Sequence, residues 1–221
     1  MTGNQIFTIF YGLLMLVILF VPTVAQYPLY YFTKPLIMIS LMGWVVLIPD
    51  ERIVRGKKLL LTGMFFALVG DCLLMLKGYF LEGLAAFLIM QWCYVIAFRK
   101  DYTQKIPIKN ALLFALPIAV STGILLNMLL QEISAYSMSI AIIIYTISIG
   151  TMLWFSLMRK FSVDFRSFIM VAAGALLFTV SDSLIAWNKF VSPVENGHFW
   201  IMSTYMMAQY LITRGMLKLP A

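Results

Sequence analysis

The stretch FIMVAAGALLFTVSDSLIAW, residues 168–187, decides the fold class of this protein. Its twenty residues are about the number that a helix needs to cross the hydrocarbon core of a bilayer. One carboxylate, Asp182, interrupts the apolar and small residues. No regular polar and apolar alternation suggests a strand instead. The stretch therefore predicts a transmembrane helix that carries an acidic group inside the membrane.

Seven further apolar stretches surround this one. The eight predicted spans are 6–24, 35–48, 59–76, 80–98, 111–130, 137–157, 168–187 and 199–217. The second is short and could begin earlier, near Tyr27. The first has no preceding basic residue and no cleavage pattern, so we interpret it as a span and not as a signal peptide. We expect residues 1–221 to form one all-α membrane domain, a bundle of eight transmembrane helices.

Composition and charge agree with a membrane protein. The chain is 62% hydrophobic and 11% charged, with a mean hydropathy of +0.95, whereas a soluble domain is about a quarter charged. Thirteen of the 16 Lys and Arg residues lie after the second, fourth, sixth or eighth span. Basic residues in short loops mark the cytoplasmic side, so both termini should be cytoplasmic and nucleic acid is not the expected partner. A bacterial inner membrane fits this bias, and an internal eukaryotic membrane is the alternative.

Only two of the nine acidic residues, Asp71 and Asp182, are flanked on both sides by long apolar runs. A charge at such a position costs about 3 kcal/mol even on insertion scales, so a functional role is the first hypothesis. A structural hydrogen bond between helices is the alternative. At about 1.5 Å of rise per residue, the two carboxylates lie at similar depths, just beyond the midplane towards the outer side.

The surroundings of the two aspartates are alike. Each has a Phe and a small residue before it, and a leucine follows two residues later. The next span carries a glutamine beside aromatic residues in both cases, Gln91 and Gln209. This pattern suggests a parallel 4+4 pseudo-repeat, and chance similarity between apolar helices is the alternative.

Several other polar residues in or near the spans are candidates for substrate binding, although each could instead form an interhelical hydrogen bond or snorkel to the surface. They are Lys34, Gln91, Tyr94, Tyr145, Ser181, Asn188, Lys189 and Gln209. The single histidine, His198, and the isolated cysteines Cys72 and Cys93 are too few for an ordinary His/Cys metal site. We expect no cofactor and no metal.

Six stretches of the chain resemble the YhhN-like membrane proteins, a family that includes the lysoplasmalogenases. The resemblance covers nearly the whole chain, and Ser-Asp-Ser-Leu and Ala-Gln-x-Leu-Ile are its most specific parts. The stretches are 32–36 (FTKPL), 70–74 (GDCLL), 83–87 (GLAAF), 174–184 (GALLFTVSDSL), 188–190 (NKF) and 205–212 (YMMAQYLI). One position departs from the family pattern, because Gln91 stands where the family leads us to expect a histidine.

The resemblance implies that the protein hydrolyses the vinyl ether bond of a lysoplasmalogen. The products would be a fatty aldehyde and glycerophosphoethanolamine or glycerophosphocholine, and Asp71 and Asp182 would be catalytic. A vinyl ether hydrolyses when an acid protonates its carbon and water traps the resulting oxocarbenium ion. One carboxyl that keeps its proton and one ionised carboxylate can divide these roles without a metal.

Two other classes of function fit the same residues. Paired membrane carboxylates in a pseudo-repeat also suit a proton-coupled transporter or a lipid flippase. A structural or binding protein would use the aspartates only for hydrogen bonds to the glutamines of neighbouring helices. Only the family resemblance favours the hydrolase over the transporter, and the sequence indicates neither the headgroup nor the oligomeric state.

Overall fold

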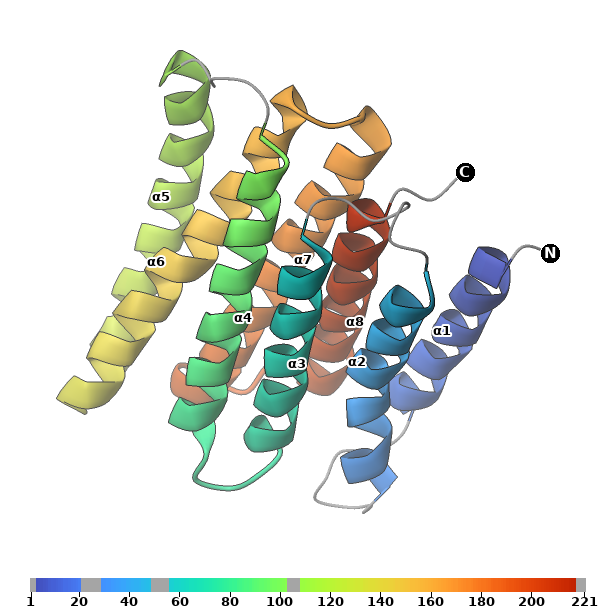
Figure 1. Ribbon diagram of the computed structural model, residues 1–221. Helices are drawn as coiled ribbons and strands as arrows, with labels where there is room; N and C mark the ends of the chain where they lie inside the picture. Colours follow the sequence, from blue (N-terminus) through green and yellow to red (C-terminus); the bar gives the residue numbers. More distant parts are fainter. Residues whose placement is uncertain (1–2, 21–28, 49–55, 103–107, 218–221) are drawn as a thin grey trace.

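A computed structural model describes residues 3–20, 29–48, 56–102 and 108–217 of the chain (Figure 1). Within these residues the long elements are all α-helical, which confirms the predicted all-α class. They are α1 (Gly3–Phe20), α2 (Leu29–Leu47), α3 (Lys57–Leu74), α4 (Phe80–Lys100), α5 (Ile108–Glu132), α6 (Tyr136–Met158), α7 (Phe165–Phe190) and α8 (Gly197–Met216), with a 3₁₀ turn, η2 (Arg159–Phe161), after α6.

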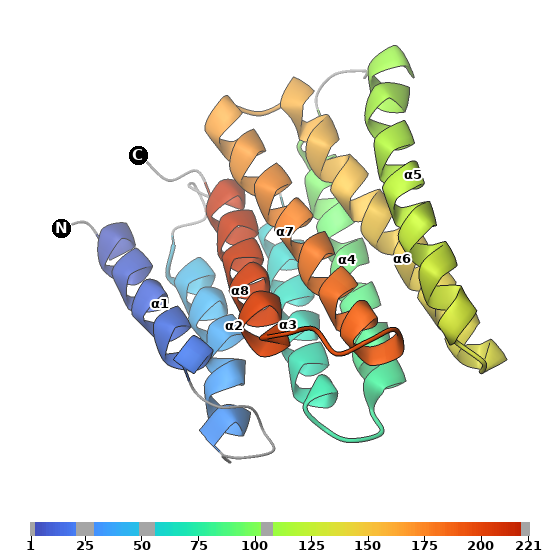
Figure 2. The same cartoon turned by 180° about the vertical axis from the view of Figure 1, so that it is seen from behind.

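The helices run up and down through one bundle, and α1 begins at the same end at which α8 ends (Figures 1 and 2). The most extensive contacts join α7 to α8 and α3 to α4. These two pairs correspond to each other in the predicted 4+4 pseudo-repeat, which stays a prediction. Helices α2 and α6 pack beside the pairs, whereas α1 and α5 lie at opposite edges of the bundle (Figure 1).

Six of the helices in the described residues are long and apolar enough to cross a membrane, which makes the chain a multi-pass membrane protein. They are α1, α2, α4, α5, α6 continued through η2, and α7. Helix α3 does not meet this criterion, since it carries Lys57, Lys58 and Asp71. Helix α8 is also more polar than the other helices. Composition alone therefore supports six of the eight predicted spans.

Helix α2 begins at Leu29, so the predicted start of the second span at Pro35 is wrong, and the possible earlier start is correct. The suggested position near Tyr27 lies outside the described residues. Pro35 sits inside the helix, where its ring lacks the N–H that would bond to the preceding turn. Because the helix begins at Leu29, Lys34 lies in its second turn and not at its start, and the side chain is buried.

Close approach of α7 and α8 depends on Gly174. A Cβ at this position would lie 2.8 Å from the Ala208 carbonyl oxygen and 2.9 Å from the Ile212 amide nitrogen. Both are backbone atoms, so no side-chain movement could make room for it. Small residues allow this kind of backbone contact between membrane helices, where packing replaces the hydrophobic effect as the driving force.

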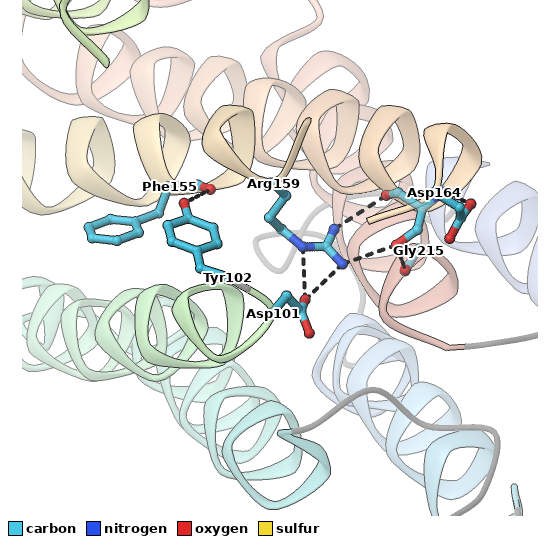
Figure 3. A network of polar contacts seen from close by, with 7 residues as sticks. Asp101, Tyr102, Phe155, Arg159, Asp164 and Gly215 are labelled. Atoms are coloured by element: carbon cyan, nitrogen blue, oxygen red, sulfur yellow. Dashed lines mark hydrogen bonds and ion pairs between the residues drawn. The ribbon is translucent and has the colours of Figure 1, made fainter. Parts of the chain in front are cut away.

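A polar network closes the bundle at the end where α4, α6 and α8 finish and α7 begins (Figure 3). Arg159 is fully buried and forms an ion pair with Asp101, with 2.9 Å between Nη2 and Oδ2. The same guanidinium donates to the carbonyl and the hydroxyl oxygens of Ser167, whose hydroxyl donates to the Gly215 carbonyl at 2.6 Å. From the sequence we expected Asp101 and Arg159 to be loop residues, with Arg159 only a signal of topology. In the structure they join the end of α4, η2, α7 and α8 inside the protein.

Replacing Arg159 by Met should lower the free energy of unfolding by about 3 kcal/mol, because the buried Asp101 carboxylate loses its cation. Arg166 is exposed in the first turn of α7 and provides a matched control. Thermal unfolding in detergent should show a large loss for Arg159→Met and little change for Arg166→Met. Equal effects of the two substitutions would contradict this interpretation.

Candidate active site

Asp71 lies near the C-terminal end of α3 and is only 2% exposed. Its Oδ1 is 3.4 Å from Nζ of Lys34 on α2, and its Oδ2 accepts a hydrogen bond of 2.6 Å from the Tyr205 hydroxyl on α8. A buried carboxylate requires an opposite charge and hydrogen-bond donors in good geometry to remain ionised. Both are present, so these contacts can stabilise an ionised Asp71, and they tie three helices together.

Asp182 occupies a different environment on α7. Its Oδ2 accepts a short hydrogen bond from the hydroxyl of Tyr145 on α6. Among the described residues it forms no ion pair, and it is partly open to a cavity of about 60 Å³ between α3, α4, α5, α6 and α7. The other lining residues are mostly apolar: Leu74, Phe80, Leu84, Phe87, Thr122, Leu125, Leu129, Ile142, Tyr145, Thr146, Ile149, Thr179, Ser183, Ile185 and Ala186.

Of the two carboxylates only Asp182 lines the cavity. The ring of Phe87 connects the two environments. It lines the cavity, and it packs so closely against Gly70 that a Cβ there would lie 2.7 Å from the ring. The centroid of Phe87 also lies 6.1 Å from that of Tyr205, the hydrogen-bond partner of Asp71. An aromatic cluster therefore joins the Asp71 ion pair to the wall of the Asp182 cavity.

The two glutamines do not bond to the aspartates, contrary to the structural alternative drawn from the sequence. Gln209 on α8 accepts a 2.9 Å hydrogen bond from the Tyr94 hydroxyl. Gln91 on α4 is fully buried, and neither of its amide atoms makes a hydrogen bond of ordinary geometry within the described residues. Its side chain nevertheless interacts with that of Tyr145, the partner of Asp182. Gln91 thus places an unsatisfied amide beside the site.

The remaining predicted site residues lie on the C-terminal half of α7. The Ser181 hydroxyl donates to the Ile201 carbonyl oxygen at 3.0 Å and serves packing against α8. Asn188 is exposed, and its side-chain oxygen accepts from the Val194 amide at 2.9 Å. Lys189 is also exposed, with its Nζ 4.5 Å from the ring centroid of Phe80, which lines the cavity. Of these three residues only Lys189 lies beside the cavity.

Sequence reasoning missed Tyr205 as a member of the site. It lies one helical turn before Gln209, and this spacing puts both side chains on one face of α8, so the signal was present. Thr179 and Ser183 were also missed, although both are polar, lie three residues before and one residue after Asp182, and line the cavity. No cluster of three potential metal ligands among His, Cys, Asp and Glu occurs in the part of the chain that the structure describes.

Comparison with known proteins identifies a family. Residues 29–216 match the sequence model of the YhhN family. The chain is similar to human lysoplasmalogenase TMEM86B, with 34% identity over 74% of this chain and 65% of the relative. It is similar to human lysoplasmalogenase TMEM86A, with 33% identity over 68% of this chain and 62% of the relative. A lysoplasmalogenase of Mycobacterium bovis shows 25% identity over 73% of this chain and 61% of the relative.

These matches span less than two thirds of the length of the relatives, so the relatives contain further sequence that the comparison does not cover. No solved structure matches the chain.

Replacing Lys34 by Met should lower the free energy of unfolding by about 3 kcal/mol, because Asp71 is left buried without its cation. The double variant Lys34→Met/Asp71→Asn should regain part of this loss, since it removes both charges. Thermal unfolding of both single variants and the double variant measures the coupling. Strictly additive losses would show that the ion pair does not stabilise the bundle.

Gln91 and Gln209 provide a second, internally matched test. Gln209→Leu should cost about 1 kcal/mol, because it leaves the Tyr94 hydroxyl without its acceptor. Gln91→Leu removes an amide that has no hydrogen bond of ordinary geometry, so its melting temperature should equal or exceed that of the unmodified protein. A loss for Gln91→Leu as large as that for Gln209→Leu would rule out an unsatisfied amide.

Proposed function

The chain belongs to the YhhN family, and on this premise we propose that it is a lysoplasmalogenase. It would hydrolyse the vinyl ether bond of a lysoplasmalogen to a fatty aldehyde and a glycerophosphoethanolamine or glycerophosphocholine. The names of relatives that are 25–34% identical support this reaction class. The observation that carries the proposal is Asp182, hydrogen bonded to Tyr145 and open to an apolar cavity inside the bundle.

The surroundings of the two carboxyl groups support different roles for them. Asp71 has a cation, Lys34, and a hydroxyl donor, so it suits the ionised carboxylate. Asp182 has a hydroxyl donor but no recorded ion pair among the described residues, and it faces an apolar cavity. A carboxyl in such surroundings favours its neutral form. We therefore assign Asp182 as the general acid and Asp71 as the anion that stabilises nearby positive charge.

The proposed reaction needs only a proton and water. The Asp182 carboxyl transfers its proton to the second carbon of the vinyl ether, and the first carbon and the ether oxygen share the resulting positive charge. Water adds to the first carbon and loses a proton back to the Asp182 carboxylate. The resulting hemiacetal breaks its bond to the glycerol oxygen, which takes up the hydroxyl proton, and the aldehyde leaves. Neither a redox change nor a metal ion is required, so we propose a metal-independent ether hydrolase.

Gln91 is a candidate to bind the attacking water in this scheme. Its amide can both donate and accept hydrogen bonds, and it lies beside Tyr145 without a hydrogen bond of ordinary geometry among the described residues. A buried amide that lacks a protein partner of ordinary geometry can hydrogen bond to a water molecule instead. We propose that Gln91 orients the attacking water. This would also explain how the chain manages without the histidine that the family resemblance led us to expect.

We further propose that all eight helices of one domain, residues 1–221, cross a bacterial inner membrane with both termini in the cytoplasm. The more polar helices α3 and α8 are sheltered by the apolar helices against which they pack, such as α4 and α7. This orientation puts Lys189 at the outer surface, about 10 Å along α7 from Asp182. A lysine there can bind the phosphate of a lysophospholipid headgroup.

Asp182→Asn should lower vinyl ether hydrolysis at least 100-fold, in the range expected for a general acid. Asp71→Asn should also lower it, while Glu195→Gln, a change in an exposed loop, should have no effect. The measurement is aldehyde release from a lysoplasmalogen by purified protein in lipid nanodiscs, with folding checked by thermal unfolding. Full turnover by folded Asp182→Asn protein would refute the proposal.

A proton-coupled transporter or a flippase remains the second candidate, favoured by the Lys34–Asp71 ion pair inside the bundle. Such pairs also occur in proton pathways. The two functions differ in their product. A transporter would move a lysophospholipid across sealed proteoliposomes in a proton-dependent way and release no aldehyde.

A further inference from the structure

Helix α5 is only loosely attached to the bundle. Of its 25 residues only Leu129 is buried, and its contacts are with α6 and α7. Figures 1 and 2 both show α5 beside α6 at the edge of the bundle farthest from α1. Seven of its large apolar side chains, among them Ile108, Leu112 and Leu116, are exposed to the surroundings of the bundle, which in a membrane are lipid chains.

An apolar groove of about 500 Å³ lies between α5 and α6. Its walls contain small residues at helical spacing on α5, including Ala115, Ala119 and Gly123, and they also include Gly150 on α6, which packs against Ile118 and Thr122. A Cβ at Gly123 would meet nothing within 4 Å, so the groove is open at this point and is not filled by neighbouring side chains. Trp154 and Phe155 line the end of the groove that is farther along α6 from Tyr145.

The groove adjoins the Asp182 cavity. Thr122 on α5 and Thr146 on α6 line both spaces, and Thr146 directly follows Tyr145, the hydrogen-bond partner of Asp182. The cavity itself is about 60 Å³, enough for a reacting bond and a water molecule but too small for a fatty chain. A long-chain substrate whose bond reaches Asp182 therefore needs a second space, and the groove is adjacent.

Polar and apolar features are arranged along one line. Lys189 lies beside Phe80, which lines the cavity. Asp182 lies about two turns before Lys189 on α7, and the groove extends along α6 from Thr146 to Trp154. The last interval covers roughly 12 Å along α6. This order, from cation to carboxyl to apolar groove, is the order of phosphate, ether bond and hydrocarbon chain in a single-chain lysophospholipid.

We infer that the groove between α5 and α6 binds the hydrocarbon chain of a lysophospholipid whose ether bond lies at Asp182. The inference rests on the proposed function, because that function places the ether bond at Asp182. The chain enters sideways from the bilayer between the two helices, and Gly123 and Ala119 keep the groove open. The groove thus sets the preference for chain length, which neither the family nor the carboxylates determine.

Substitutions that fill the groove test this inference. Gly123→Trp, with Ala119→Trp as a second variant, should lower kcat/KM for a substrate with a sixteen-carbon chain by at least about tenfold relative to an eight-carbon chain. Gly12→Trp on α1 is the matched control, because a Cβ there also meets nothing within 4 Å. The control should keep the preference of the unmodified protein. An unchanged preference in folded Gly123→Trp and Ala119→Trp proteins would overturn the inference.

A binding measurement separates this inference from the proposed function. An alkyl-ether lysophospholipid cannot undergo vinyl ether hydrolysis, and a diazirine at the end of its chain labels whatever lies there. We expect the label on peptides from α5 and α6. This labelling should be lost in Gly123→Trp and should decrease when unlabelled lysophospholipid competes with the probe. Labels confined to other helices, or displaced only by diacyl phospholipid, would contradict the inference. Absence of hydrolysis together with correct labelling would overturn only the enzyme proposal.

Discussion

The hydrocarbon core of a membrane contains no water, so every polar group on a spanning helix must find its partner inside the protein. The carboxylate of Asp71 shows how this constraint shapes the bundle. It is bound by Lys34 from α2 and by Tyr205 from α8, and these contacts hold three helices in a fixed rotation. At the end where α8 finishes, the Arg159 guanidinium has the same effect on α4, α7 and α8. The need to pair buried polar groups therefore determines which helices meet and which faces they turn towards each other.

The bundle has a firmly packed part and a loosely packed part. Helices α3, α4, α7 and α8 make its most extensive contacts, and Gly174 lets two backbones touch. Helix α5 has almost no buried side chain and leaves a groove beside α6. Asp182 lies between these parts, on a helix packed tightly against α8 but facing the cavity that adjoins the groove. The proposed lipid hydrolysis would need this combination, because the catalytic groups must stay in place while a long chain enters from the membrane.

Differences between the two carboxyl sites matter more than their similarity. The sequence pattern around Asp71 and Asp182 suggested two copies of one half-site, each with its own glutamine. In the structure each carboxyl has a tyrosine as its donor, but only Asp71 also has a cation. Two carboxyl groups with unlike partners can hold different protonation states, which is the basis of acid–base chemistry with paired carboxylates. In the proposed mechanism the buried amide of Gln91 is a third group, which orients the attacking water.

The sequence by itself determined the helical class, nearly every helix boundary to within a few residues, and the presence of two acids inside apolar helices. These features are local, because a helix satisfies its own backbone and the length of an apolar run can be compared directly with the bilayer thickness. Tertiary structure alone decided that Lys34 is buried against Asp71, that Arg159 is an internal residue, and that tyrosines and not glutamines bind the aspartates. Such contacts depend on how each helix is rotated and how closely it approaches its neighbours. Side chains that are far apart in the sequence determine both together.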